Sequence, residues 1–206
     1  MSIEILCTCP WLDTSKADYV KYHDEEWGVP VLNDNKMFEF LVLESAQAGL
    51  SWYTILKRRD GYRKAFANFD VDKVAQFTLA DEERLVGDAS IIRHKGKIAA
   101  TVNNARCFMA IQKEFGSFIH YIWSFVGNKV QVSNINELKD YPATSLISDN
   151  LSKDLKKRGF KFVGSTTMYA HLQASGLIND HSNNCHRKQA IIDSYPTLGL
   201  QWEQYK

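Results

Sequence analysis

The chain lacks any run of apolar residues that approaches the roughly 20 needed to cross a bilayer. Its start, 1–10, has no basic segment and carries Glu4 within a short apolar stretch, so no signal peptide is expected. Internal repeats, low-complexity linkers and sharp changes of composition are absent as well. A chain of 206 residues is long enough for one domain or for two small lobes sharing a core. We expect a single compact domain, 1–206, in the cytoplasm, with no membrane partner.

An excess of charge of one sign is also lacking. The 25 lysines and arginines nearly balance the 24 aspartates and glutamates, and the net charge is +1. The net charge therefore does not by itself indicate a nucleic-acid-binding protein, although local basic patches matter more than the net charge. Cysteine is scarce, with four residues, too few for a disulfide scaffold; in a reducing compartment they are better read as thiols or metal ligands.

Helical periodicity of apolar residues dominates what is present, and it predicts a mainly α protein. Gly49 should break one helical stretch and Gly116 should end another. A third helix should be capped by Ser148 or Asp149 at its start and should stop at Gly159. Only 130–132 resembles a strand, and it is short and isolated. The helices are expected at 36–56 (broken at 49 and resuming from 51 to 63), 71–76, from 79 onward, 98–115, 118–126, 148–158 and 166–175.

Two residues near the C-terminus have the spacing of a metal site. His181 and Cys185 are four positions apart, so one helical turn or a tight loop can direct both at one ion. Cys9 and His23 could complete a Cys2His2 set, which suits zinc, and four protein ligands would leave no position for a reacting water.

The spacing alone leaves this site open. Pairs of this kind arise by chance, Cys7 competes with Cys9, and His186 competes with His181. If the site is real, it closes a long loop and removes chain entropy from the unfolded state, of order a few kcal/mol. That argues for a structural metal.

One carboxylate, Glu44, stands in an otherwise apolar helical stretch. It lies either on an exposed polar face beside Glu39, which is the commoner arrangement, or in the interior, where it must be paired or used. Aromatic residues concentrate in the same part of the sequence. Such residues more often belong to the hydrophobic core than to a ligand-binding site. Together with the acidic run 24–26 they have the composition needed to hold a flat, cationic ring. They are Trp11, Tyr19, Tyr22, Trp27 and Trp52.

At this point the sequence resembles the 3-methyladenine DNA glycosylase I family. The similarity runs in colinear order from about Cys9 to Cys185, and several blocks of this length are far more specific than one motif. Beyond Cys185 the tail matches nothing of use. The matching stretches are YHDEEWGVP (22–30), LESAQAGLSW (43–52), IIRHKGKI (91–98), WSFV (123–126), LKKRGFKFVG (155–164) and GLINDH (176–181).

The resemblance implies a structural zinc, a site for the excised base and a fold. The fold is the helix-hairpin-helix glycosylase architecture, with the zinc joining the N-terminal segment 9–23 to 181–185. The implied zinc ligands are Cys9, His23, His181 and Cys185. The residues implied to hold the base are Glu44, Tyr22 and Trp52, with Trp11, Tyr19 and Trp27 as further walls.

The resemblance also places a DNA-gripping hairpin near 87–92, within an element of about 82–106. This hairpin lacks the Gly-x-Gly of the wider superfamily, which puts its phosphate contacts in doubt, and the family lacks the superfamily's catalytic aspartate, so no acid is assigned that role. Among the basic groups 57–59, 93–97 and 156–158 we favour Arg93, Lys95 and Lys97 for phosphate contact because they follow the hairpin. A charge run is also commonly just a solvated face. Leu50 could fill the gap left by an extruded base, or could be core.

The function implied is base-excision repair: a monomeric enzyme that flips an alkylated purine, 3-methyladenine, out of double-stranded DNA and hydrolyses its glycosidic bond. Glu44 is expected to recognise the base first and to assist catalysis second. Two rivals are a zinc-dependent hydrolase and a non-enzymatic, zinc-stapled nucleic-acid-binding module. A third possibility keeps the fold but takes another modified base.

Overall fold

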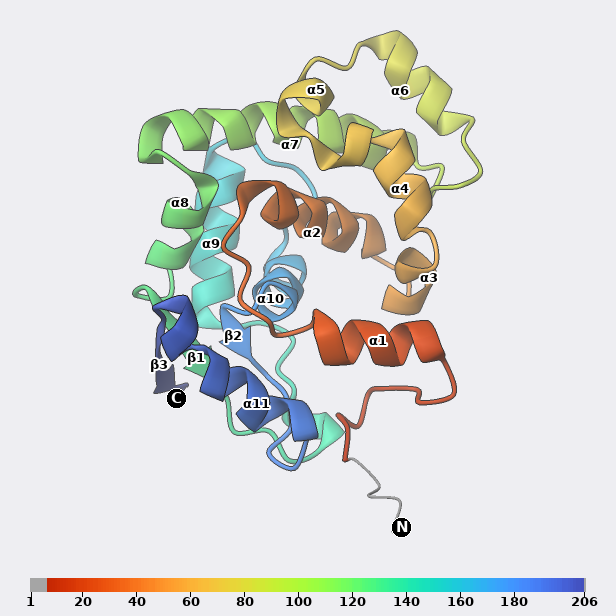
Figure 1. Ribbon diagram of the computed structural model, residues 1–206. Helices are drawn as coiled ribbons and strands as arrows, with labels where there is room; N and C mark the ends of the chain where they lie inside the picture. The colour runs from red at the N-terminus through yellow and green to blue at the C-terminus, as the bar shows by residue number, and fades with distance from the viewer. Residues whose placement is uncertain (1–6, 206) are drawn as a thin grey trace. The chain divides into compact units, whose positions relative to one another are not determined.

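The computed structural model describes residues 7–205 (Figure 1). The chain separates into two compact units. The first comprises Met1–Val31, Trp123–Ala143 and Leu172–Lys206, and the second comprises Leu32–Ile122 and Thr144–His171. Nothing in the sequence marks these boundaries, two of which fall inside helices. The start of the chain, where no signal peptide was expected, falls largely on residues 1–6, outside the described residues. Within 7–205 no helix has the length and apolar character needed to cross a membrane.

The second unit is helical. Its longest helix, α7, packs against α5, α6 and α2, and Figure 1 shows α5 and α6 beside it. Phe108 of α7 stacks on Phe118, with ring centroids 4.0 Å apart, and meets the edge of Phe38 in α2. The elements that begin in this unit are α2 (Asp34–Gln47), α3 (Trp52–Leu56), α4 (Arg59–Ala65), the 3-10 turn η1 (Ala67–Phe69), α5 (Val71–Ala75), α6 (Leu79–Val86), α7 (Lys95–Phe115), α8 (Phe118–Ser124), α9 (Leu146–Lys157) and α10 (Ser165–Ala174).

The helix α2 forms the centre of this unit because it is apolar on nearly all sides. Every residue from 37 to 46 is buried, including two glutamates. The Asn33 side chain caps its first turn by accepting from the Lys36 amide at 3.0 Å. A helix buried so completely gives any charge on it an environment of low dielectric.

The first unit combines helices with a small parallel sheet of order β2-β1-β3. Val130 and Val132 of β1 are buried, and Asn179 of β2 donates to the hydroxyl of Tyr195 at 3.0 Å. Its elements are α1 (Ala17–Glu25), β1 (Lys129–Val132), η2 (Leu138–Asp140), β2 (Ile178–Asn179), α11 (His186–Ser194), η3 (Pro196–Leu198) and β3 (Gln201–Gln204).

The expected helices are confirmed, with differences at their ends. The expected helix from 51 to 63 is two helices, separated at Lys57 and Arg58. The expected caps at Ser148 and Asp149 are wrong: Ser145 is the N-cap, because its hydroxyl accepts from the Ser148 amide. Gly116 and Gly159 adopt positive φ just after their helices, as expected. The strand at 130–132 is not isolated, since it is the middle strand of the sheet.

Candidate functional site

Four potential metal ligands meet inside the first unit. The ligand atoms of Cys9, His23, His181 and Cys185 all lie within 4.8 Å of one another, and all four residues are buried. Nδ1 of His181 lies 3.3 Å from Sγ of Cys9 and 3.4 Å from Sγ of Cys185, and Nε2 of His23 lies 3.6 Å from Sγ of Cys185. The structure thus selects Cys9 over Cys7 and His181 over His186, and the Cys2His2 cluster could hold a metal ion.

The geometry of this cluster fits a tetrahedral ion. Zn–S bonds of about 2.3 Å and Zn–N bonds of about 2.0–2.1 Å, at tetrahedral angles, separate S and N by about 3.6 Å, close to the distances found. The nitrogens that face away from the cluster are also engaged: Nδ1 of His23 lies 2.7 Å from Oδ1 of Asp24, and Nε2 of His181 lies 2.9 Å from the Trp27 carbonyl. Such outer hydrogen bonds orient the histidines that bind metals.

Local backbone geometry brings His181 to this place. It is the second residue after β2, and its amide donates to the Asn179 side chain at 3.2 Å. Gly28 has φ +77°, and a Cβ there would lie 3.0 Å from Cδ2 of His181. Only glycine combines this φ with so close an approach to the imidazole.

The two thiols are electrostatically unequal. Hydrogen bonding from Cys9, together with the rings of His181 and His23, lowers the pKa of Cys185. The hydrogen bond to Cys185 and burial raise the pKa of Cys9. The hydrogen bonds of the cluster therefore favour ionisation of one thiol, that of Cys185. A bound cation would favour ionisation of both thiols.

Aromatic side chains surround the histidines. The Trp11 ring meets Trp27 edge-on at 4.8 Å and Tyr19 at 5.4 Å, while Trp27 meets His181 at 4.6 Å. Trp27 and Tyr22 are buried, and Trp11 and Tyr19 are partly buried. Trp11 and Trp27, which the resemblance assigned to the walls of a base pocket, therefore lie against the histidines of the Cys2His2 cluster.

The second unit carries two buried glutamates on α2 with opposite surroundings. Glu39 accepts from Arg59 at 2.6 Å, from Arg63 at 3.0 Å and from Lys36 at 3.1 Å. Burial acts to raise the pKa of Glu39, but these cations outweigh it and lower the pKa. Arg59, in the basic group 57–59, is consequently buried and committed to an ion pair.

Glu44 has no such partner. Its side chain is 4% exposed, and within the described residues no hydrogen bond or ion pair is found for it. Burial raises its pKa to about 8. The exposed arrangement beside Glu39 is thus wrong, since both glutamates are buried. An unpaired carboxyl in an apolar helix is typical of a group whose partner is a ligand.

The segment after α2 carries the other residues expected at the site. Leu50, 39% exposed, lies in the short turn between α2 and α3. Trp52 begins α3 and is half-buried, and the hydroxyl of Ser51 caps this helix by accepting from the Thr54 amide. The structure thus places Leu50 and Trp52 a few residues beyond Glu44, on the segment that joins two packed helices.

The helix pair α6 and α7 is joined by the eight residues 87–94. Arg93 and Lys95 are exposed. Nζ of Lys97, in contrast, donates to the carbonyls of Ala46 and Ala48 at 2.8 and 2.6 Å. Sequence reasoning treated the three cations alike, because nothing local distinguishes an exposed lysine from one that reaches another helix.

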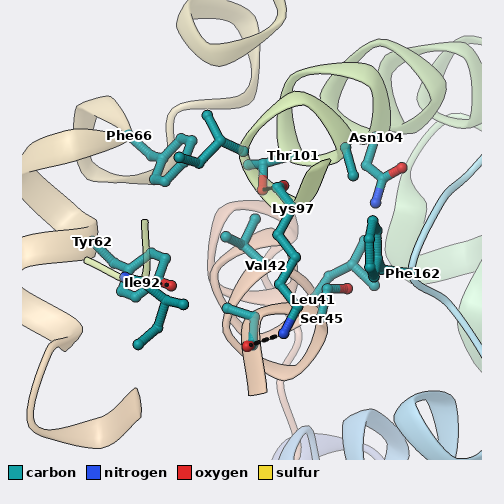
Figure 2. Close-up of a pocket in the computed structure, with 13 residues that line it drawn as sticks. Leu41, Val42, Ser45, Tyr62, Phe66, Ile92, Lys97, Thr101, Asn104 and Phe162 are labelled. Atoms are coloured by element: carbon teal, nitrogen blue, oxygen red, sulfur yellow. Dashed lines mark hydrogen bonds between the residues drawn. The ribbon is translucent and has the colours of Figure 1, made fainter. Parts of the chain in front are cut away.

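A small cavity lies where α2, α4 and α7 meet, with Phe162 at its edge (Figure 2). Its free volume of about 10 Å³ admits about one water molecule and no purine. The hydroxyl of Ser45 faces it without a hydrogen-bond partner. The cavity lies beside the C-terminal end of α2.

The comparisons with known proteins agree with these features. The model of the methyladenine glycosylase family matches residues 11–188. The chain is 49% identical over 177 residues to DNA-3-methyladenine glycosylase 1 of Escherichia coli K12, covering 86% of this chain and 94% of that protein.

Solved structures show the same likeness. A crystal structure of 3-methyladenine DNA glycosylase I superposes with a TM-score of 0.85 at 45% identity, covering 87% of this chain and 98% of the other. The Staphylococcus aureus enzyme, solved to explain its recognition of 3-methyladenine, gives 0.83 at 39% identity, covering 85% and 93%. The match of sequence over most of the length, together with the match of fold, shows that this chain belongs to the methyladenine glycosylase family.

Proposed function

We propose that this protein is a DNA glycosylase that removes 3-methyladenine from alkylated DNA. The observation that carries the proposal is Glu44, a buried carboxyl without a partner of its own in a chain of this family. The similar enzymes named above act on 3-methyladenine, and the Glu44 site has the chemistry for a cationic purine. An ion pair with such a ligand would repay the cost of burying the carboxylate.

Methylation at N3 gives the adenine of DNA a formal positive charge and weakens its bond to the sugar. The enzyme then has mainly to extrude and hold the base, and unstacking costs a few kcal/mol, less for a damaged base. We propose that Trp52 stacks on the extruded ring, where cation–π attraction contributes about 0.5–2 kcal/mol, and that Glu44 accepts from its exocyclic amine. Tyr22 would contact another edge, with Trp11, Tyr19 and Trp27 as supporting walls.

Hydrolysis itself needs little activation in this scheme. The oxygen of water bonds to C1′ while the C1′–N9 bond breaks, and the methylated base leaves neutral with the electron pair. One proton of the water goes to solvent. Holding the extruded base and stabilising the positive charge that shifts from the base to the sugar as the bond breaks are then the chief tasks of the side chains.

We propose that α6, residues 87–94 and α7 form the helix-hairpin-helix that grips double-stranded DNA, with Arg93 and Lys95 on phosphates. Leu50 would fill the gap left by the base. Such binding weakens as salt rises, because phosphate contacts release counterions. The protein is expected to act as a monomer.

We propose zinc for the Cys2His2 cluster, in a structural role. Bound there, zinc would cross-link segments far apart in sequence; Cys9 and Cys185 would supply thiolates, and His23 and His181 neutral imidazoles. Four protein donors fill a tetrahedral shell, which argues against the rival zinc-dependent hydrolase.

The test is release of 3-methyladenine from methylated duplex DNA by the purified protein. Glu44→Gln and Trp52→Ala should each slow release at least about tenfold. Glu137→Gln, which changes an exposed carboxylate at the N-cap of η2, serves as the matched control and should release base at the wild-type rate. A folded wild-type protein that releases no 3-methyladenine would refute the proposal, and wild-type rates from both site variants would refute the assignment of the site.

A further inference from the structure

The segment that carries Leu50 is a defined β-turn. The Leu50 amide donates to the Gln47 carbonyl at 2.6 Å. Ala48 has φ −42° and ψ 115°, and Gly49 has φ +81°. These angles are those of a type II turn over 47–50, which requires a residue tolerant of positive φ at its third position.

The ammonium of Lys97 is bound to this turn. Nζ lies 2.8 Å from the carbonyl of Ala46, in the last turn of α2, and 2.6 Å from the carbonyl of Ala48. Figure 2 shows Lys97 extending from α7 toward α2, and its dashed line marks the bond to Ala46. No carboxylate of residues 7–205 forms an ion pair with Lys97, so its charge acts on the C-terminal carbonyls of α2.

The Ala48 carbonyl matters most, because it belongs to the central peptide of the turn. Type I and type II turns differ chiefly by a rotation of that peptide through about 180°. A cation held on its oxygen favours one orientation, and hydrogen bonds to charged groups are among the stronger ones in proteins. The interaction therefore holds the turn in the form that presents Leu50.

The backbone of Lys97 is itself held firmly. Its amide donates to Nδ1 of His94, the N-cap of α7, at 3.1 Å, and its carbonyl accepts from the Thr101 hydroxyl at 3.0 Å. The fixed point of the contact is thus the first turn of α7, directly after the loop 87–94. The other side of the contact is the turn 47–50.

We infer that Lys97 is a positioning residue rather than a phosphate ligand: it couples the start of α7 to the turn 47–50 and so fixes the geometry in which Leu50 enters DNA. This rests on the proposed function of Leu50. The contact links the element that grips DNA to the residue that replaces the extruded base. It acts on extrusion and leaves the holding of a free base to other residues.

The experiment compares Lys97→Met, Lys97→Arg and the control Lys113→Met, an exposed lysine of the same helix. Lys97→Met should slow single-turnover release of 3-methyladenine from duplex DNA about tenfold or more, and Lys97→Arg should restore most of it. The affinity for free 3-methyladenine and the slope of DNA affinity against salt should stay at wild-type values. Lys113→Met should match wild type throughout.

Three results would overturn the inference. They are a wild-type release rate in Lys97→Met, an equal loss of affinity for the free base, and a salt slope reduced by about one, which is the signature of a lost phosphate contact. If Lys97→Met does not fold, Gly49→Ala disturbs the same turn from the other side. Its Cβ meets no atom within 4 Å, so only the backbone conformation is affected. It should show the same separation of release from base affinity.

Amide hydrogen exchange keeps the inference separate from the proposed function. In Lys97→Met the amides of 48–52 should exchange faster than in wild type, while those of α7 should not change. Unchanged exchange at 48–52 would contradict the inference. A wild-type protein that releases no 3-methyladenine would instead refute the proposed function and leave the exchange result to decide on the contact.

Discussion

At the scale of single residues, two glutamates five positions apart on one helix have opposite roles. Glu39 is held by Arg59, Arg63 and Lys36, so its charge is compensated within the protein. Glu44 is equally buried but lacks compensation, and its pKa rises to about 8. A buried carboxylate is stable only when it is paired. Removing a cation from Glu39 should therefore destabilise its carboxylate, whereas adding a cation beside Glu44 should stabilise the carboxylate there.

The pH dependence of activity should report Glu44 directly. The alkylated base carries its charge at every pH, so attraction requires the carboxylate form. With a pKa of about 8, kcat/KM should rise with pH up to that value, by about tenfold for each unit below it, and level off above. Glu44→Gln should abolish this slope. The prediction is tested by measuring kcat/KM on methylated DNA from pH 6 to 9.5. A flat wild-type profile would contradict the assignment of Glu44.

Ionisation of the buried Glu44 should also destabilise the folded protein. The folded pKa of Glu44, about 8, lies above the ordinary 4.5, so between these values the native state holds more protons than the unfolded state. Stability must then fall as pH rises through that window. Glu44→Gln should therefore stabilise the protein by on the order of 3–5 kcal/mol at pH 8 and by almost nothing at pH 4.5. Chemical denaturation at both pH values measures this. Equal gains at both would show that packing, not ionisation, is responsible.

At the scale of elements, α7 organises the second unit by more than apolar packing. Asn104, buried on this helix, exchanges two hydrogen bonds with the backbone of Lys161, each 2.9 Å long. Neighbouring Asn103 donates to the Gly159 carbonyl at 2.8 Å. These bonds hold the loop after α9, in which Phe162 has φ +56°, a conformation that costs a residue with a side chain about 1–2 kcal/mol.

Asn104→Ala should release that loop. It leaves a buried amide and carbonyl unpaired, so the free energy of unfolding should fall by about 1–3 kcal/mol. Asn35→Ala is a suitable control, because Asn35 makes a single exposed hydrogen bond to Asn68 and should cost less than about 0.5 kcal/mol. Urea denaturation of both variants tests the difference. Equal losses would mean that the Lys161 contacts do not hold the loop.

The helices and strands also show how much of the fold could be predicted from the sequence. Long amphipathic or apolar segments such as α2 and α7 were predictable, because their periodicity is local. The sheet was not, since β2 has two residues and its pairing with β1 joins positions nearly fifty apart in the sequence. For the site, the resemblance supplied Glu44, while the partners of Glu39 and Lys97 depend on contacts between helices, which no local pattern records.

At the scale of the whole molecule, the Cys2His2 cluster joins distant parts of the chain, with contacts between residues 162 and 172 positions apart in sequence. Cys9 and His23 lie near the start of the sequence, and His181 and Cys185 lie in its last quarter. All four nevertheless belong to the first compact unit. That unit is assembled from three separate stretches, two of which the four ligands join. A cross-link of such length removes much entropy from the unfolded chain. If the cluster holds the proposed zinc, the first unit should depend on this metal more than the helical second unit does.

Metal removal tests this dependence. A strong chelator should lower the melting temperature by several degrees or more and release about one zinc per chain, because the binding energy of a structural site adds to folding stability. Cys9→Ser should reproduce the loss of zinc and of stability. Cys7→Ser, two residues away and exposed, is the matched control and should keep both. The lower melting temperature would follow from loss of the cross-link, since the serine hydroxyl ionises too weakly to replace a thiolate. Full zinc content in Cys9→Ser, or its loss in Cys7→Ser, would show that the ligand set assigned here is wrong.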